Sequence, residues 1–441
     1  MSMSRRQLLA STAWSAVAGA AAARRSLAQA EVSRTADDFA DWAWVRGQFD
    51  LTPEYLHFSQ FFIVSHPRPV REAIERLRRA IDSNPFLIVE HGLFGTRDRN
   101  MQWPAQRAAA DYIGGRPEDI ALVDSTTEGL ALIYHGLSLK PGDEILATTH
   151  DHYVHHESIR LAAQKLGATW RRVPLYDRAD AVTVDEVTAN LRQAIAPNTR
   201  VIGLTWVHSG TGVKLPVRKL AAVISEANIK RAENDRILLV VDGVHGFGNQ
   251  DETPVDMECD FFVAGTHKWI FAPRGTGIVW GRADAWTRIR PTVPSMSSDD
   301  AYEGWVENKD PGPTQARLVS PGGFKAFEHQ WAMPEAFAFH QSIGRKRIAD
   351  RVAALSTQCK EGLARMSHVK LHTPRAPELS AGINCFEVAG VAPETAVHKL
   401  LEEKVIASAS PYKTSYVRLA PSLVNDEQQV DQALRAVYAL S

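Results

Sequence analysis

The chain has 441 residues, of which 44% are hydrophobic, 23% charged and 8% aromatic, an ordinary composition for a globular protein. This composition excludes a disordered, collagen-like or disulfide-scaffold protein, and the length predicts two or three domains. The 50 Lys and Arg residues nearly balance the 51 Asp and Glu residues, so no overall charge favours nucleic acid or an anionic membrane as a partner.

Residues 1–30 differ from the rest of the chain, because they contain four arginines and no acidic residue. The remaining 411 residues hold 46 basic and 51 acidic side chains, a formal net charge of −5. Within the first segment, Ser4–Leu9 (SRRQLL) resembles the twin-arginine export motif. An apolar run at Leu8–Ala23 follows, and Ala28–Ala30 (AQA) has the small residues of a cleavage site.

The apolar run has 16 residues, fewer than the roughly 20 that span a bilayer as a helix. We therefore expect residues 1–30 to be a twin-arginine signal peptide recognised by the Tat export machinery. The remaining chain would then be periplasmic, without a stable membrane anchor. A buried alanine-rich helix and an uncleaved anchor are the alternatives.

Short runs of β-branched and other apolar residues recur along the middle of the chain, and small or polar residues end each run. They predict strands at Ile120–Val123, Glu144–Thr148, Val201–Val207, Ile237–Val241, Phe261–Val263 and Gly277–Trp280. The segments between them predict helices at Glu128–Leu139, His156–Leu166 and Leu215–Ala227. This alternation is typical of an α/β protein whose mainly parallel sheet is covered on both faces and binds ligands at the carboxyl ends of its strands.

A stretch rich in Pro and Gly, Pro291–Gly323, predicts a connection between domains. Beyond it, the sequence predicts helices at Glu335–Ala354 and Ala392–Glu403 and strands at Gly382–Val388 and Ser415–Leu419. We therefore expect an N-terminal arm at residues 31–66, a large cofactor-binding domain at 67–315 and a smaller α+β domain at 316–441.

A lysine and an aspartate follow two of the predicted strands. Lys268 lies in Ala264–Trp269 (AGTHKW), and a lysine at a buried strand end is costly unless it is paired or used chemically. An aldehyde cofactor uses such a lysine by forming a Schiff base. Asp242, in Val240–Gly246 (VVDGVHG), lies 26 residues earlier and could keep a pyridine nitrogen protonated. Either residue alone has an ordinary explanation, an exposed loop lysine or a turn aspartate, but the pair favours a cofactor site.

Two further segments follow predicted strands. Asp124–Gly129 (DSTTEG) opens a helix whose free N–H groups could hold a phosphate, although a plain capping box explains it equally well. In Thr149–Tyr153 (THDHY), His152 could stack on a flat cofactor. The alternative is a metal site formed by His150, His152, His155 and His156, which lacks the spacing of zinc ligands, so we expect no metal.

The helix cap, the aromatic residue, the acid and the lysine occur in an order that resembles the class V aminotransferase family, pyridoxal-phosphate enzymes of fold type I. The resemblance covers nearly all of residues 40–441, and its most specific part is Asp242–His245 followed by Thr266–Lys268. It implies pyridoxal 5′-phosphate as the cofactor, Lys268 as the lysine that binds it covalently and carries the proton, and Asp242 as the partner of its pyridine nitrogen.

The resemblance also implies roles for other residues of the site. His152 would stack on the cofactor ring, and His245 would lie near its phenolic oxygen. The implied phosphate ligands are Thr126, Thr127, Thr266 and His267. Ser209 stands where many members carry a polar ring contact such as Asn. Gly275 and Thr276 resemble the loop that reaches the phosphate bound by a partner subunit, which implies a homodimer. Arg418 resembles the arginine that binds the substrate carboxylate.

The sequence indicates the reaction less closely than it indicates the cofactor. A cysteine desulfurase would need a reactive cysteine shortly before Arg418, and the nearest, Cys385, lies 33 residues upstream in a predicted buried strand, so we reject that branch. The segments Asp41–Arg46, Ser65–Val70 and Pro321–Glu328 resemble the isopenicillin N epimerase-like branch. Within it, the export signal is similar to that of periplasmic pyridoxal-phosphate enzymes of pyoverdine siderophore maturation.

We expect a small-molecule amine or an amino-acid-containing substrate and an aminotransferase-type reaction, because no second acid or base for epimerisation stands out in the sequence. An epimerase or a lyase is the alternative. A metal-dependent hydrolase that uses the histidines of His150–His156 is a further alternative from a different class of enzyme.

Overall fold

The computed structural model describes residues 36–440. The predicted signal peptide at 1–30, with its cleavage site, therefore lies outside the described residues. The chain divides into two compact units, Met1–Trp44 and Val45–Ser441. In the first, the structure describes α3 (Ala36–Ala40), and α4 (Trp42–Arg46) runs across the division. Among the described residues, no helix has the length and apolar character needed to cross a membrane.

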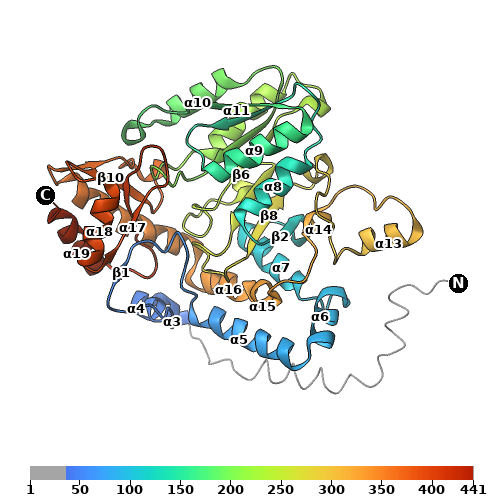
Figure 1. Ribbon diagram of the computed structural model, residues 1–441, viewed down its shortest axis with the longest axis horizontal. Coiled ribbons are helices and arrows are strands. Elements are labelled where there is room, and N and C mark those ends of the chain that lie inside the picture. Colours follow the sequence, from blue (N-terminus) through green and yellow to red (C-terminus); the bar gives the residue numbers. More distant parts are fainter. Residues whose placement is uncertain (1–35, 441) are drawn as a thin grey trace. The chain divides into compact units, whose positions relative to one another are not determined.

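A seven-stranded sheet forms the centre of the second unit, in the order β2-β8-β7-β6-β5-β3-β4 (Figure 1). Its strands are β2 (Ile120–Val123), β3 (Glu144–Thr148), β4 (Thr169–Val173), β5 (Thr199–Thr205), β6 (Leu238–Asp242), β7 (Phe261–Gly265) and β8 (Gly277–Gly281). Within this described sheet β8 runs in the direction opposite to the other six strands. The predicted α/β class with a mainly parallel sheet is therefore confirmed.

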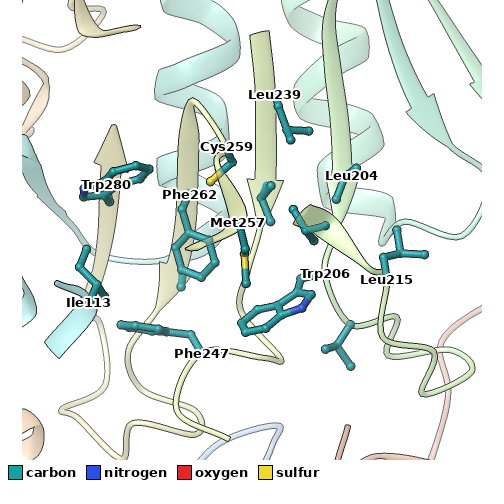
Figure 2. Packing of buried hydrophobic residues seen from close by; sticks show 14 of the residues in the cluster. Ile113, Leu204, Trp206, Leu215, Leu239, Phe247, Met257, Cys259, Phe262 and Trp280 are labelled. Atoms are coloured by element: carbon teal, nitrogen blue, oxygen red, sulfur yellow. The ribbon is translucent and has the colours of Figure 1, made fainter. Parts of the chain in front are cut away.

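Helices cover both faces of this sheet because its strands are apolar on both sides. In β7, Phe262 and Ala264 contribute to one hydrophobic core, and Phe261 and Val263 to the other. The first core is closed by α7 (Gln102–Ile113), α10 (Val184–Ala194), α11 (Val217–Asn228) and α16 (Met333–Ile343). The second is closed by α8 (Thr126–Gly136), α9 (Tyr153–Leu166) and α14 (Ala316–Val319). Figure 2 shows Leu204, Leu239, Phe262 and Trp280 in the first core.

A smaller antiparallel sheet, in the order β12-β13-β10-β9, lies toward the end of the chain. Its strands are β9 (Val369–Leu371), β10 (Asn384–Val388), β12 (Ser408–Ala409) and β13 (Val417–Leu419). Its core is shared with α17 (Arg345–Ala364), α18 (Pro393–Glu402) and α19 (Glu427–Tyr438). The strand β1 (Leu56–His57) pairs in parallel with β11 (Val405–Ile406). The predicted domain boundary after residue 315 stays a prediction.

The structure differs from the predicted elements at several points, of which three bear on the organisation of the chain. The helix predicted at Glu335–Ala354 is two helices, α16 and α17, because Gly344 between them has φ of +96°. The predicted connection Pro291–Gly323 contains α13 (Asp299–Glu307) and α14. The edge strand β4 was not predicted, because it carries half-exposed polar residues. The other helices are α5 (Arg68–Ser83), α6 (Pro85–Phe94), α12 (Pro254–Met257) and α15 (Phe327–Trp331).

Candidate active site

The carboxyl ends of β5, β6 and β7 form the centre of the site. The register of the sheet pairs Asp242, the last residue of β6, with Thr205 in β5 and with Val263 in β7. Lys268 follows three residues after the end of β7. Parallel neighbouring strands therefore bring the predicted acid and the predicted lysine to one edge of the sheet.

The glycines that follow Asp242 are required by close packing. A methyl group on Gly243 would overlap the Phe262 ring, and one on Gly246 would overlap the Trp206 ring. A larger residue at either position would therefore displace the turn that holds Asp242. This packing explains the two glycines of the segment Val240–Gly246.

Lys268 lies beside His245, with 3.4 Å between Lys268 Nζ and His245 Nε2. Burial lowers the pKa of the lysine to about 8, although the charge of Asp242 acts in the opposite direction. The turn after Lys268 is closed by Phe271, whose N–H donates to the Lys268 carbonyl at 3.0 Å. Phe271 has φ of +58°, which is rare for a residue other than glycine, so its buried ring holds a strained turn in place.

Asp242 is only 3% exposed. Its Oδ1 accepts a hydrogen bond from the Val244 N–H at 3.1 Å. Burial raises the pKa of the carboxyl to about 6, and the Val244 N–H and the charge of Lys268 limit the rise. Asp242 is therefore an anion at neutral pH, as a partner for a protonated ring nitrogen must be.

The start of α8 is hydrogen-bonded to the end of β7, and we call the group Ser125, Thr126, Gly265 and His267 the cradle. Ser125 caps the helix and accepts the Glu128 N–H at 3.1 Å. The next hydroxyl, Thr126 Oγ1, accepts the Gly265 N–H at 2.7 Å. A Cβ on Gly265 would come within 3.2 Å of Thr126 Oγ1 and 2.7 Å of the His267 ring. Thr126 and His267 thus surround a position that only glycine leaves open, beside the positive end of a helix.

The remaining residues expected near a phosphate, in this subunit or in a partner subunit, lie in three different environments. Thr266 and Thr276 are fully buried, with 2.6 Å between their hydroxyl oxygens, and they stabilise the loop beneath the cradle. Thr127 is exposed on the first turn of α8. Gly275 is exposed and has φ of +72°, and a Cβ added to it would meet no described atom within 4 Å. Its expected contact with a second subunit stays a prediction.

His152 caps α9, and its Nδ1 accepts the Val154 N–H at 3.4 Å. Burial, with the charges of Lys268 and Arg418, lowers the pKa of this imidazole to about 4, so it is neutral at neutral pH. The ring is half-buried and meets the Tyr412 ring edge to face at 6.1 Å. A neutral, partly open aromatic face is what stacking on a flat ring requires.

Arg418 lies in β13 and is 6% exposed. Its guanidinium donates to the carbonyls of Ser209 at 3.1 Å and Ala409 at 2.9 Å, and to the Ser408 hydroxyl at 3.2 Å. The Phe61 ring covers it, with its centroid 4.8 Å from Cζ. These contacts fix the position of the guanidinium group. They use three of its five N–H groups, so two are left for a ligand such as a carboxylate.

The structure adds three residues that sequence reasoning did not assign. Phe61 covers Arg418 and also lies edge to face with His245 at 5.7 Å. The Tyr412 hydroxyl bonds the Ser209 hydroxyl at 2.8 Å, which gives the unassigned serine a partner. Asp151 is buried and accepts hydrogen bonds from the last residues of β3 and β5. Only Asp151 had a signal in the sequence, as an acid directly before the stacking histidine.

The histidines considered as metal ligands have other partners. The His150 ring stacks on Tyr176 at 3.8 Å. His155 Nε2 lies 2.7 Å from the Tyr134 hydroxyl, and His156 Nε2 lies 2.7 Å from a backbone carbonyl. In the part of the chain that the structure describes, no three His, Cys, Asp or Glu residues could together hold a metal ion. The arrangement therefore lends no support to the metal-dependent hydrolase.

The residues present fit the expected cofactor. His245 Nδ1 is buried and has no hydrogen-bond partner among residues 36–440, so a polar group of a bound ligand would satisfy it. A lysine for an aldehyde, an anionic carboxylate for a ring nitrogen and a helix N-terminus for a phosphate open onto the same strand ends.

Comparisons with known proteins give the family of the chain and its relatives. The family model "Aminotransferase class-V" matches residues 94–436. Over 417 residues the chain is 27% identical to the isopenicillin N epimerase of Streptomyces clavuligerus, covering 91% of this chain and 99% of that protein. It is 26% identical to a cysteine desulfurase of Serratia proteamaculans (strain 568) over 303 residues, 68% of this chain and 69% of that protein.

A solved structure shares the fold. A C-DES mutant with glycine covalently linked to the PLP cofactor matches with a TM-score of 0.78 and 22% sequence identity. The match covers 89% of this chain and 98% of that one. The predicted fold type therefore has an independent confirmation.

Proposed function

Because the chain belongs to the aminotransferase class-V family, we propose that it removes the α-proton of a substrate bearing an amine and a carboxylate, in an aminotransferase-type reaction. Its cofactor is pyridoxal 5′-phosphate. When bound, this cofactor supplies an aldehyde for the substrate amine and a ring that accepts the electron pair left at the α-carbon. The observation that carries the proposal is Lys268 beside buried Asp242 and His245 at neighbouring strand ends.

Lys268 is suited to move the α-proton. With its pKa lowered by burial to about 8, an appreciable fraction of its amine is neutral at neutral pH and accepts a proton at Nζ. Burial also lowers the pKa of His245 well below its usual value, so the adjacent imidazole adds no competing positive charge. The lysine is thereby the group of the pair that can both take and return a proton.

Asp242 and Arg418 hold the two ends of the reacting system. Asp242 is ionised above its pKa of about 6 and can keep a proton on the ring nitrogen. Arg418 presents its free N–H groups to the substrate carboxylate, and the Phe61 ring over the guanidinium keeps water from one face.

The loss of the cofactor band on lysine substitution tests this assignment. We expect the purified protein to be yellow and Lys268→Ala to lose the visible absorbance band. The matched control is Lys360→Met, because Lys360 is also buried with a pKa lowered to about 8 but donates to Ser380 and to two backbone carbonyls. A colourless wild-type protein that does not take up the cofactor would refute the proposal.

The reaction itself is tested by mass spectrometry. Amino acids and amine-bearing siderophore precursors are incubated with the enzyme and a 2-oxo acid. Aminotransfer predicts replacement of the amine by a carbonyl group on one molecule and its appearance on the other.

Sulfur transfer is disfavoured by the thiols. Cys259, Cys359 and Cys385 are all buried. Burial raises the pKa of Cys359 and of Cys385 to about 12, so neither carries a thiolate at neutral pH. These environments are unlike that of a cysteine acting as a nucleophile on substrate sulfur.

Epimerisation is the second candidate, and two observations favour it. The likeness to an isopenicillin N epimerase extends over 99% of that protein. The Ser209 and Tyr412 hydroxyls are bonded to each other, and the Tyr412 ring contacts the His152 ring, so the site holds hydroxyl groups besides the Lys268 amine that could donate a proton. Epimerisation would exchange the α-hydrogen for solvent deuterium and invert the centre without loss of the amine.

We also propose that the enzyme acts in the periplasm as a homodimer, on an amino-acid residue of a pyoverdine-type siderophore. The twin-arginine motif at Ser4–Leu9, the Ala28–Ala30 cleavage pattern and the resemblance to the epimerase-like branch support this proposal. Export is tested by cell fractionation, in which Arg5→Lys with Arg6→Lys should leave the protein in the cytoplasm. Recovery of the unaltered protein from the cytoplasm alone would contradict it.

A further inference from the structure

Asp151 is a buried carboxylate that the proposed reaction does not use. It lies between β3 and α9 and is 2% exposed. Its Oδ2 accepts the Thr148 N–H at 2.8 Å, and its Oδ1 accepts the Thr205 N–H at 2.8 Å. One carboxylate therefore bridges the carboxyl ends of β3 and β5, which fixes the position of its charge.

This charge lies next to the strand that carries Asp242. Thr205, which donates to Asp151, is paired with Asp242 in the register of β5 and β6. Neighbouring strands are roughly 4.8 Å apart, so two buried carboxylates lie at adjacent strand ends. Such a pair is costly in a protein interior unless a positive charge lies within reach of both.

Three of the four histidines around Asp151 supply no positive charge at neutral pH. The fourth, His156, has its Nε2 2.7 Å from the Thr148 carbonyl oxygen and 3.9 Å from Asp151 Oδ2. Burial lowers the pKa of His150 and His155 to about 4 and that of His208 to about 3, so these rings are neutral. Burial raises the pKa of the nearby tyrosines, which are also neutral. The titratable groups around Asp151 are His150, His155, His156, His208, Tyr134, Tyr176, Tyr412 and Asp242.

Asp151 itself stays ionised. Burial alone would raise its pKa, but His155 and His208, which carry charge only in acid, and the Thr148 N–H bring the pKa below the usual value. The strand ends therefore contain two anionic carboxylates at neutral pH, and only Asp242 has so far been assigned a partner on the cofactor.

We propose that Asp151 is a positioning residue whose fixed negative charge, added to that of Asp242, stabilises the protonated ring nitrogen of the cofactor. A cationic nitrogen is attracted to both carboxylates, and the attraction is strong because both carboxylates are buried. The inference rests on the cofactor assigned above and holds for either fate of the α-proton.

Binding of two cofactor forms tests this inference without measuring turnover. Apoprotein is titrated with pyridoxal 5′-phosphate and with its 1-deaza analogue, in which a C–H group replaces the ring nitrogen. In Asp151→Asn we expect about tenfold weaker binding of pyridoxal 5′-phosphate and a change of no more than about twofold for the analogue. If the two ligands lose the same factor in affinity, so that the ratio of their affinities does not change, the inference is overturned.

The matched control is Asp260→Asn. Asp260 is 6% exposed, and its carboxylate accepts the Leu239 N–H at 2.7 Å, but it lies before β7, at the opposite end of the strands. Its replacement also removes a buried charge and a strand contact, together with an ion pair to Arg282 at 2.8 Å, so it should lower thermal stability and leave the ratio of the two affinities unchanged. A similar change in ratio for both variants would also refute the inference.

A measurement on the unaltered protein covers the case in which Asp151→Asn does not fold. The ¹⁵N chemical shift of ring-labelled cofactor reports whether its nitrogen is protonated. We expect a protonated nitrogen from pH 6 to at least pH 8, and an unprotonated nitrogen at pH 7 would overturn the inference. Failure of the protein to bind any cofactor would instead refute the proposed function.

Discussion

Lys268 and Asp242 have pKa values displaced toward each other by the same cause. Burial disfavours charge on both, so it lowers the pKa of the lysine to about 8 and raises that of the aspartate to about 6. Between these values the lysine is mostly a cation and the aspartate mostly an anion, and the pair can exchange a proton with bound ligands at little cost. This window includes neutral pH.

The pH dependence of cofactor capture follows from the displaced pKa of Lys268. Attack on the cofactor aldehyde needs the neutral amine, so its rate should rise with pH and level off above about pH 8. With a lysine of ordinary pKa, the rate of attack would keep rising up to about pH 10.4. Asp242→Asn removes the charge that raises the lysine pKa, so the midpoint should move to lower pH. Stopped-flow absorbance measures the rate, and a midpoint near 10 would contradict the prediction.

Tyr412 separates the two candidate reactions. Tyr412→Phe removes the hydroxyl that bonds Ser209 and leaves the ring that meets His152. We expect amine transfer to stay within about threefold, and any inversion at the α-carbon to fall by about 100-fold, because that step would need the phenol as acid. Chiral chromatography and amine-transfer assays on the same samples measure both. An equal fall in the rates of amine transfer and of inversion would mean that the Tyr412 hydroxyl shapes the site and is not the acid for inversion.

At the scale of elements, strand ends and the turns that follow them position most of the assigned side chains. β6 ends at Asp242 and β7 ends three residues before Lys268, and α8 begins at the cradle residue Thr126. The turns leave little room for change, because glycines in them touch rings of the core and Phe271 has a left-handed backbone.

Gly243→Ala tests this tight packing. The added methyl group would overlap the Phe262 ring, so we expect a loss of unfolding free energy of about 3 kcal/mol and weaker cofactor retention. Gly115→Ala is the control, because the nearest atom to its Cβ would be Trp280 Nε1 at 3.0 Å, which is far less crowded. The double variant Gly243→Ala with Phe262→Leu should recover much of the stability. Thermal unfolding of a fully stable single variant would disprove the packing argument.

For the whole molecule, the strands of the central sheet could be predicted because they are short apolar runs buried on both faces. The break at Gly344 could not, since the apolar pattern continues from α16 into α17 and a single glycine within a helix is tolerated. The edge strand β4 escaped prediction because Arg171 and Arg172 give it a polar pattern.

The candidate site also contains residues that the sequence could indicate and residues that it could not. Lys268, Asp242 and His152 could be selected from the sequence because each lies at or within four residues of a strand end and belongs to a segment that resembles a family motif, and their roles stay predictions. Phe61 and Tyr412 were not, since their roles arise from contacts across the fold, such as that between Ser209 and Tyr412, which lie 203 residues apart. No local pattern records a contact of that kind.

The proposed dimer is tested by a charge placed on the loop at Gly275. Gly275→Asp should weaken retention of the cofactor phosphate at least about fivefold if the loop reaches a second subunit, because a carboxylate repels phosphate. Gly390→Asp is the control, since Gly390 is also exposed, has a similar φ of +75° and leaves the same open space for a Cβ among residues 36–440. Dialysis followed by absorbance measures retention, with sedimentation to measure mass. Equal effects of the two variants would contradict the dimer contact.

The three buried cysteines have a consequence for chemical durability. Oxidants and disulfides attack the thiolate, and burial raises the pKa of each of these thiols while it denies reagents access. The folded chain therefore presents no thiol that an oxidising compartment or its disulfide-forming catalysts can reach. It needs no reducing partner to keep its cysteines as they are.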